Sequence, residues 1–113
     1  MVNKYIPKQG DIVYLDFNPT KGHEQKGIRP AIVISNNTFN AHTKMVFVCP
    51  ITSNTKEFPT HYILEDSKKV KGSVLCEHIR SIDYEERNLK FIEHASDNDL
   101  LSSIVLTNAC IEE

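Results

Sequence analysis

The stretch Gly10-Asp-Ile-Val-Tyr-Leu-Asp-Phe-Asn-Pro19 decides the fold class, because it contains the strongest strand signal in the chain. Both alternating sets of residues at positions 11–17 are rich in β-branched and aromatic side chains, which predicts a strand with both faces covered. Pro19 ends this strand, since proline has no N–H to donate to a ladder. The polar segment 18–28 then forms a loop that is long for a compact domain, and such loops often carry function.

Further apolar runs follow this loop, with turn-forming residues between them. Their β-branched residues predict buried or half-buried strands that are short and close together in sequence. These strands are expected at residues 31–35, 45–51, 60–64 and 73–79, with a further short strand at residues 89–93.

The C-terminal segment changes to helical spacing and predicts a helix with one apolar stripe. Ser96 followed by Asp99 three residues later resembles a capping box at the start of this helix. Several short strands with one terminal helix predict a mainly β fold: a small antiparallel barrel, closed or half-closed, with a C-terminal helix. The expected stripe consists of Leu100, Leu101, Ile104, Val105, Asn108 and Ile111.

The composition of the chain fits one ordinary globular domain spanning residues 1–113, with 40% hydrophobic and 25% charged residues. No apolar run approaches the roughly 18 residues of a membrane helix, and the first residues lack the apolar core of a secretory signal. Cys49, Cys76 and Cys110 are odd in number and widely spaced, which favours reduced thiols in a cytoplasm over disulfides or a thiolate zinc site.

The formal net charge of −2 hides an uneven distribution along the chain. Residues 1–82 contain eleven Lys and Arg against seven Asp and Glu, a net of +4, whereas residues 83–113 contain two against eight, a net of −6. A basic body with an acidic C-terminal segment can present a cationic face to phosphate groups. A solvated acidic helix explains the same asymmetry, so charge alone does not decide between the two.

Several classes of catalytic site find little support in the sequence. The four glycines are scattered and none precedes a Lys-Ser/Thr pair, so the sequence contains no phosphate-binding glycine loop. The five histidines include no His-x-x-x-His pair, and we expect neither a metal site nor another cofactor. Cys76 and His78 would point the same way on a strand, but the apolar surroundings of Cys76 favour a packed core thiol over a nucleophile.

The segment at positions 21–31, Lys-Gly-His-Glu-Gln-Lys-Gly-Ile-Arg-Pro-Ala, gathers three kinds of reactive group. Glu24 supplies an acid, His23 a titratable imidazole, and Arg29 a fixed cation at the root of a buried strand. Pro30 biases Arg29 toward an extended backbone, which would fix the direction of its side chain. Taken alone, such a loop is more often a solvated turn than a site, and the wider pattern is needed to decide.

Four blocks of sequence resemble the MazF/PemK family of toxin endoribonucleases, in the right order and over nearly the whole chain. The opening Gly10-Asp-Ile-Val-Tyr-Leu-Asp-Phe-Asn-Pro-Thr20 is similar to the first strand of that family, and Gly22-x-Glu-Gln-x-Gly-x-Arg-Pro-Ala31 matches its specific loop signature. Pro50-Ile-Thr52 is similar to the family's Pro-x-Thr. Glu77-His-Ile-Arg-Ser-Ile-Asp83 resembles a later strand, in which several members have glutamine in place of His78.

The resemblance implies a homodimer with an SH3-like barrel core, metal-independent cleavage of single-stranded RNA, and neutralisation by a cognate MazE-like antitoxin with an acidic C-terminal segment. Metal-free cleavage uses the 2′-hydroxyl of the RNA as nucleophile and leaves a 2′,3′-cyclic phosphate and a 5′-hydroxyl. The reaction needs a base for the 2′-hydroxyl, a group that stabilises charge on the phosphorane oxygens, and an acid for the leaving 5′-oxygen.

The candidate catalytic residues are Arg29, Thr52 and Glu24. Arg29, carried over from the Arg-Pro motif, suits charge stabilisation and can donate a proton, whereas a deprotonated guanidinium is too costly for a base. Thr52, carried over from the Pro-x-Thr motif, can give one hydroxyl hydrogen bond. Glu24 is the natural base, with His23 as the alternative. The candidate RNA-binding residues are Phe17, Thr20, Lys21, Gln25, Ser53, Lys56, Glu77, His78 and Arg80, where Phe17 fits a core position equally well.

Two other functions compete with RNA cleavage. The fold resembles that of the gyrase-poisoning CcdB toxins, which bind a protein and cleave nothing, but such a poison needs neither the Arg29-Pro30 motif nor Thr52. A plain SH3-like interaction module would need an aromatic peptide groove, and the chain has four Tyr and no Trp. We therefore expect a sequence-specific endoribonuclease toxin that acts in the cytoplasm.

Overall fold

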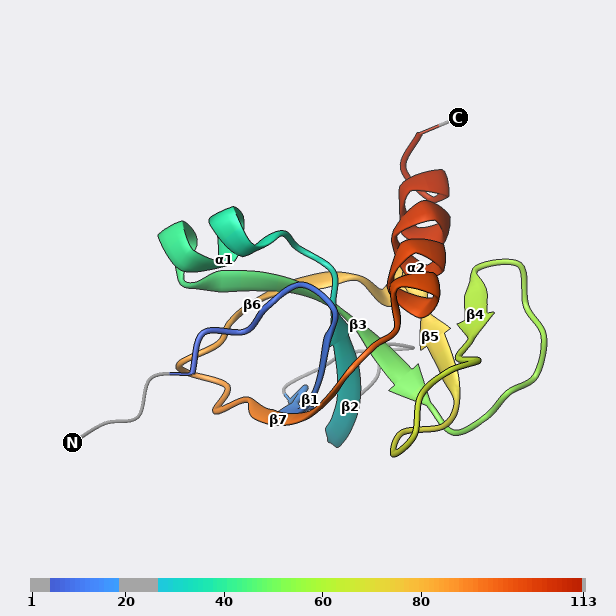
Figure 1. Ribbon diagram of the computed structural model, residues 1–113, viewed down its shortest axis with the longest axis horizontal. Helices are drawn as coiled ribbons and strands as arrows, with labels where there is room; N and C mark the ends of the chain where they lie inside the picture. Colours follow the sequence, from blue (N-terminus) through green and yellow to red (C-terminus); the bar gives the residue numbers. More distant parts are fainter. Residues whose placement is uncertain (1–4, 19–26, 113) are drawn as a thin grey trace.

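Figure 1 shows the computed structural model of the chain, which describes residues 5–18 and 27–112. The order of its elements confirms the predicted mainly β fold with a C-terminal helix. No helix in this part of the chain is long and apolar enough to cross a membrane. The elements are β1 (Asp11–Asp16), β2 (Ile28–Val33), α1 (Asn37–Thr43), β3 (Met45–Thr52), β4 (His61–Ile63), β5 (Ser73–Leu75), the 3-10 helix η1 (Cys76–His78), β6 (Arg80–Asp83), β7 (Lys90–His94) and α2 (Asp97–Ala109).

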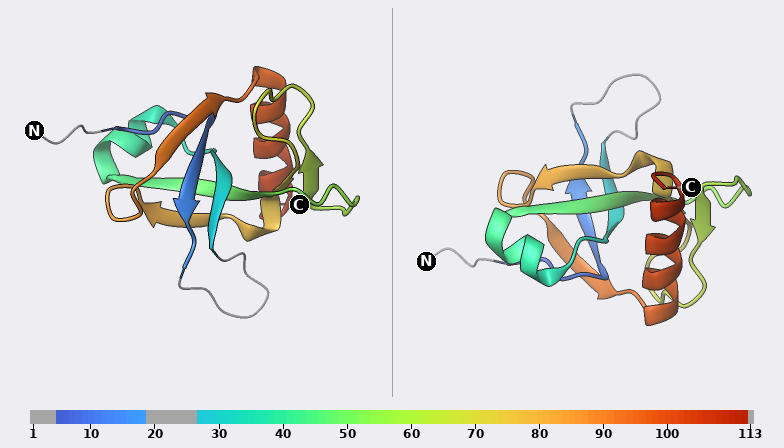
Figure 2. Two further views of the ribbon diagram at one scale, coloured as in Figure 1. Left: turned by 90° about the horizontal axis from the view of Figure 1, so that it is seen from below. Right: turned by 90° about the horizontal axis from the view of Figure 1, so that it is seen from above.

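The strands form one seven-stranded antiparallel sheet that curls into a half-open barrel. Its order is β4-β5-β3-β2-β1-β7, and β6 pairs with β3 outside this path. Among the residues that the structure describes, no pairing joins β7 to β6 or to β4, so the ring of strands is not closed. Figure 2 shows β1 and β2 running across the direction of β3, with α2 beside the C-terminal half of β3.

Two apolar clusters hold the sheet, one on each face. The first cluster lies inside the barrel and includes Leu15, Val33 and Val48. The second lies between the sheet and α2 and includes Ile12 and Ile32. Alternate residues of a strand point to opposite faces, so β1 and β2 contribute to both clusters. Burial of both faces explains why the sequences of these strands are nearly continuous apolar runs.

Strand β3 pairs with β2 along one edge and with both β5 and β6 along the other. Val48 lies opposite Arg80 and Ile51 opposite Val74, so three steps along β3 correspond to six steps along the partner segment. The three extra residues leave the ladder as η1. This inserted turn places Glu77 and His78 outside the sheet, at the edge of β3.

Two predicted strands need correction. The strand expected at residues 31–35 is β2, which begins earlier because its pairing with β1 extends back to Ile28. The strand expected at residues 73–79 stops where η1 begins, so Cys76 and His78 do not share a strand face. Cys76 is fully buried, as the core interpretation predicted.

The prediction that both faces of β1 are covered holds only for the first half of this strand. Ile12 and Val13 are fully buried on opposite faces, but Tyr14 and Asp16 are exposed. Tyr14 lies opposite Pro30 of β2, beyond the part of the sheet that α2 covers. The open half of this face is therefore available as surface.

Helix α1 lacks an apolar period, and the sequence analysis assigned no element there. It depends on side-chain hydrogen bonds instead. The Asn36 side chain caps the helix by accepting the N–H of Phe39 at 2.8 Å. The fully buried Asn40 donates from its amide to the carbonyls of Pro7 at 3.0 Å and Ser35 at 3.2 Å. These bonds fix the connection from β2 to β3.

The buried face of α2 differs from the predicted apolar stripe. Leu100 and Ile104 pack against the second cluster as expected. Beside them, the buried positions are taken by Ser103 and Thr107, whose hydroxyls donate to helix carbonyls four residues earlier. Small hydroxyl side chains let the helix approach the sheet closely. The stripe members that are exposed are Leu101, Val105, Asn108 and Ile111.

Asp99 ties the start of α2 to β4 and to the turn after β4. The Ser96 half of the predicted capping box is confirmed, since its hydroxyl accepts the N–H of Asp99 at 3.0 Å, whereas the Asp99 carboxylate bonds to partners outside the helix. The fully buried carboxylate of Asp99 accepts hydrogen bonds from the Tyr62 hydroxyl at 2.6 Å and from the N–H groups of Glu65 and Asp66, both at 3.0 Å. Burial and the bond to Asp99 raise the pKa of Tyr62 above its ordinary value. Three donors thus converge on one carboxylate.

Asp99→Ala should lower the free energy of unfolding by about 3 kcal/mol, because three donors lose their acceptor in a buried place. Asp97→Ala is the matched control, since Asp97 is exposed in the same helical turn. It should lose only its interaction with the helix dipole, about 0.3–1 kcal/mol. Denaturant unfolding of both variants measures the difference, and equal losses would contradict the anchoring role of Asp99.

Candidate active site

Arg29 and Thr52 come from the adjacent strands β2 and β3. Ala31 lies opposite Pro50 in the ladder between these strands. The ladder between the two strands ends at this pair; Arg29 and Thr52 each lie two residues further on, at the same end of the two strands, and both residues are half-buried. On its other side Arg29 is paired with Leu15 of β1, a member of the first cluster. Two of the three candidate catalytic residues therefore lie at the same end of two adjacent strands.

Contacts on several sides fix Thr52 at the end of β3. Its backbone pairs with Ser73 of β5, on the edge opposite to β2. Its hydroxyl accepts the N–H of Asn54 at 3.2 Å, which turns the chain out of the strand. Gly72 has a φ of +145°, and a Cβ at this position would lie 2.0 Å from the carbonyl oxygen of Thr52. Only glycine permits this close approach of the backbone to Thr52.

Thr52 borders a pocket of about 260 Å³ formed by the end of β3, the loop before β4, the start of β4 and η1. The pocket brings together four of the candidate site residues, Thr52, Lys56, Glu77 and His78. A further candidate, Ser53, is exposed next to Thr52. The other lining residues are Asn54, Glu57, Phe58, His61 and Leu75.

Glu77 is the centre of a cluster with two histidines. Its Oε2 atom lies 2.9 Å from Nε2 of His61 and 3.7 Å from Nε2 of His78. The rings of Phe58 and His61 pack with their centroids 4.9 Å apart. Partial burial raises the pKa of Glu77, but hydrogen bonds led by the one from His61 outweigh it and hold this pKa below its ordinary value.

His61, Asn54 and Phe58 line the pocket although no sequence pattern pointed to them. His61 is far from Glu77 along the chain, and the two meet because β4 pairs with β5, with His61 opposite Leu75. Spacing along the sequence therefore gives no hint of the cluster. A usable signal is the hairpin itself, because pairing the strand at residues 60–64 with the strand at residues 73–79 brings His61 close to the end of the second strand.

Phe17 does not offer a surface for stacking on a base. The residue is fully buried in the first cluster, and the Cζ atom of Arg80 lies 5.5 Å from the centre of its ring. Arg80 also donates from Nη1 to the carbonyl of Phe17 at 3.2 Å. Of the two alternatives for Phe17, stacking on a base is thus wrong and the core position is right, because the ring is fully buried.

The remaining candidate residues lie outside the described part of the chain. The ends that flank this segment are bonded to each other: Phe17 donates its N–H to the carbonyl of Gly27 at 3.0 Å, and the Asn18 side chain accepts the N–H of Gly27 at 3.2 Å. These two bonds form a neck between Phe17, Asn18 and Gly27. Arg29 follows this neck by two residues. The candidates outside the described residues are Thr20, Lys21, His23, Glu24 and Gln25.

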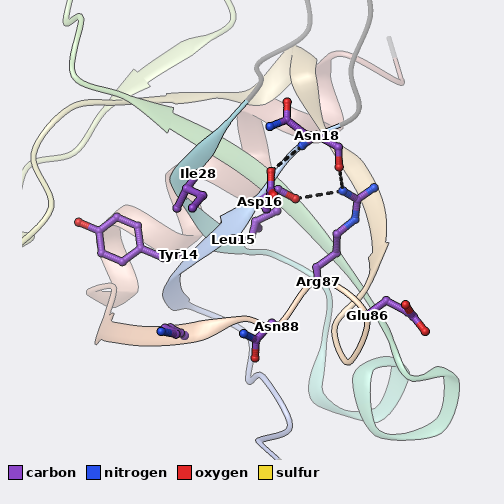
Figure 3. A pocket seen from close by; sticks show the side chains of 9 residues that line it. Tyr14, Leu15, Asp16, Asn18, Ile28, Glu86, Arg87 and Asn88 are labelled. Carbon is purple, nitrogen blue, oxygen red and sulfur yellow. Dashed lines mark hydrogen bonds between the residues drawn. The ribbon is translucent and has the colours of Figure 1, made fainter.

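Arg87 reinforces this neck from the turn before β7. It donates from Nη1 to the carbonyl of Asp16 at 3.0 Å and to the carbonyl of Asn18 (Figure 3). Its side chain also borders a hollow of about 820 Å³, lined further by Tyr14 and Ile28. The described residues that line this hollow include none of the candidate site residues.

The sequence model of the family described as "PemK-like, MazF-like toxin of type II toxin-antitoxin system" matches residues 8–103. The chain belongs to this family. The matched residues include both strands that carry Arg29 and Thr52, and the turn that carries Glu77. The resemblance inferred from the four sequence blocks is thereby confirmed.

Two relatives in the family show how similar the sequences are. The endoribonuclease toxin MazF of Escherichia coli (strain K12) is 38% identical over 87 residues, which cover 77% of this chain and 78% of that protein. The endoribonuclease MazF of Staphylococcus saprophyticus is 42% identical over 81 residues, which cover 67% of this chain and 68% of that protein.

Solved structures of family members share the fold. The crystal structure of MazF (Form-I) from Deinococcus radiodurans matches with a TM-score of 0.89 at 34% identity and covers 96% of this chain and 98% of that one. The MazE-MazF structure (Form-II) from the same organism matches with a TM-score of 0.82 at 34% identity and covers 96% and 97% of the two chains.

An NMR titration of the Glu77 carboxyl should give a pKa below the ordinary glutamate value, and His61→Gln should raise it by removing the imidazole bond. Because the pKa is lower in the folded state, the stability that this group contributes is present above the unfolded pKa. It is lost as pH falls through the folded pKa. His42→Gln, an exposed histidine on α1, is the control and should leave the pKa of Glu77 unchanged. An unchanged pKa in His61→Gln would contradict the His61–Glu77 bond.

Proposed function

We propose that this protein is a toxin endoribonuclease that cleaves single-stranded RNA, including mRNA, at specific sequences. The observation that carries the proposal is the pocket that brings Thr52 and Lys56 together, with Arg29 at the same end of the strand next to that of Thr52. A hydroxyl and an ammonium in one pocket, with a guanidinium on the adjacent strand, suit a phosphodiester. The two MazF relatives named above are endoribonucleases, and their identities of 38% and 42% support the same activity here.

The proposed reaction starts with attack of the RNA 2′-hydroxyl on the adjacent phosphorus and needs no metal ion. It yields a 2′,3′-cyclic phosphate and a 5′-hydroxyl. Arg29 stabilises the charge on the phosphorane oxygens through paired N–H donors. Thr52 donates a hydroxyl hydrogen bond to the phosphate. Glu24 takes the proton of the 2′-hydroxyl, with His23 as the alternative base.

RNA binding in this proposal uses unpaired bases, whose edges and faces are free. Lys56 attracts phosphate, and Glu77 and His78 offer hydrogen-bonding groups to a base at the same pocket. Arg80 contributes positive charge next to Phe17. The other proposed RNA-binding residues are Thr20, Lys21, Gln25 and Ser53.

The proposed regulator is a cognate antitoxin whose acidic, disordered C-terminal segment competes with RNA for the same cationic groove and folds on binding. The MazE-MazF structures from Deinococcus radiodurans support such a partner, since their MazF chains match this fold. We place the pair in the cytoplasm, where mRNA is available and buried thiols such as Cys49 and Cys76 stay reduced.

A homodimer completes the proposal, because a small barrel alone offers little concave surface for several nucleotides. The exposed apolar side chains of α2 provide a surface for a two-fold contact. Leu101, Val105 and Ile111 are 62%, 59% and 70% exposed.

Cleavage should persist in excess EDTA, because the nucleophile is the 2′-hydroxyl of the substrate. An RNA with one 2′-deoxy nucleotide on the 5′ side of the cut should resist cleavage at that site only. Mapping of 5′ ends on a long unstructured RNA locates the sites and identifies the end chemistry. Undiminished cleavage at the deoxy site would contradict this mechanism.

Arg29→Lys keeps the charge but loses the paired donors, so most activity should disappear while the fold remains. Thr52→Val removes only the hydroxyl and should cost roughly 1–3 kcal/mol of transition-state stabilisation. Thr52→Ser is the matched control, because it retains the hydroxyl and should lose less. Single-turnover rates measure all three, and normal rates in Arg29→Lys would reject charge stabilisation by Arg29.

Sedimentation equilibrium should give twice the 12.9 kDa monomer mass for the wild-type protein. The double variant Leu101→Glu, Val105→Glu should sediment as a monomer, because like charges would meet at the two-fold contact. Thr38→Glu tests an exposed polar position on the other helix, α1, and should remain a dimer. A wild-type monomer that cleaves RNA would reject the dimeric groove.

A further inference from the structure

The cluster of Glu77 with His61 and His78 includes a histidine, His61, that the mechanism above does not use. In that mechanism Arg29, Thr52 and Glu24 supply charge stabilisation, a hydrogen bond and a base. The leaving 5′-oxygen still needs a proton. Arg29 can donate a proton, but a guanidinium releases it poorly near neutral pH, so a separate acid is chemically favoured.

His61 lines the same pocket as Thr52 and is held there on two sides. Its Nε2 atom bonds to Oε2 of Glu77 at 2.9 Å, and its ring packs on Phe58. The side chain is 19% exposed, so it remains accessible from the pocket while its contacts restrict rotation of the ring. With Nε2 bonded to Glu77, the proton that His61 would give to a substrate is the one on Nδ1.

Charged and titratable groups line the pockets around His61. They come from three parts of the chain: η1, the loop before β4, and the residue that follows β4 by two positions. A carboxylate in hydrogen-bond contact stabilises an imidazolium, which is the form that a proton donor must start from. Among the described residues, no three His, Cys, Asp or Glu side chains are arranged as metal ligands. The surrounding groups are Glu77 and His78, Lys56 and Glu57, and Glu65.

We propose that His61, held in place by Glu77, is the general acid that protonates the leaving 5′-oxygen. This inference rests on the proposed endoribonuclease function. The P–O2′ bond forms while the 2′-hydroxyl proton passes to the base. The P–O5′ bond breaks, its electron pair stays on O5′, and the Nδ1 proton of the His61 imidazolium moves to O5′. The neutral imidazole then regains a proton from water, and Glu77 acts as a positioning residue.

Two substrates that differ in the leaving atom test the role of His61. In one RNA the scissile bond keeps its 5′-oxygen, and in the other the bridging atom is sulfur, which leaves without being protonated. His61→Gln should cleave the oxygen substrate at least about 100-fold more slowly than wild type, but the sulfur substrate within about tenfold of wild type. His42→Gln is the matched control and should cleave both substrates at wild-type rates.

Glu77→Gln tests the positioning role through a pH profile. The amide keeps a hydrogen-bonding group beside His61 but removes the negative charge. The alkaline limb of the rate profile on the oxygen substrate should therefore move to lower pH. A purely structural defect would instead lower the rate by the same factor at every pH.

Three outcomes decide against the proposal. Equal rate losses of His61→Gln on both substrates would show that His61 does not protonate the leaving group. Rescue by sulfur in His78→Gln but not in His61→Gln would assign the acid to the other histidine. If His61→Gln loses activity only in proportion to its loss of folded protein, while His61→Asn is folded and fully active, the result would assign His61 a structural role. Failure of the wild-type protein to cleave either substrate would instead reject the endoribonuclease function.

Discussion

Hydrogen bonding of β3 along both of its edges is the constraint on which the site depends. One edge carries β2, and the other carries β6 and then β5. Thr52 is paired in the ladder with β5, two residues beyond the end of the ladder with β2, and Arg29 lies at the same end of β2. A slip of one residue would turn each side chain of a strand to the opposite face and separate this pair. The two clusters on either face of the sheet make such a slip costly.

The pocket beside Thr52 results from two local departures from regular structure. The first is η1, which removes three residues from the edge of β3 and presents Glu77 and His78 beside the loop before β4. The second is Asp99, whose carboxylate draws Tyr62 and the following turn onto α2. Because His61 precedes Tyr62 in β4, the anchor on α2 also fixes one wall of the pocket. The stability of α2 and the geometry of the site are thus linked.

Sequence patterns predicted the parts of the fold where local preference and tertiary structure agree. The strands at residues 11–17 and 45–51 were recognisable because both of their faces are rich in apolar side chains. Arg29 and Thr52 were recognisable because they stand in family motifs. The break at η1 was not recognisable, because the sequence of residues 73–79 resembles one continuous strand. Only the register of β3 reveals the inserted turn. The face of α2 was misjudged because Ser103 and Thr107 satisfy their hydroxyls within the helix and can be buried.

The neck formed by Phe17, Asn18 and Gly27 has a consequence for how this scaffold diversifies. Its bonds, with those of Arg87, close β1 onto β2 independently of what lies between residues 18 and 27. We expect insertions, deletions and substitutions in that segment to leave the register of Arg29 with β1 unchanged. Under the proposed function, exchange of the segment would then change substrate preference while Arg29 and Thr52 stay in place.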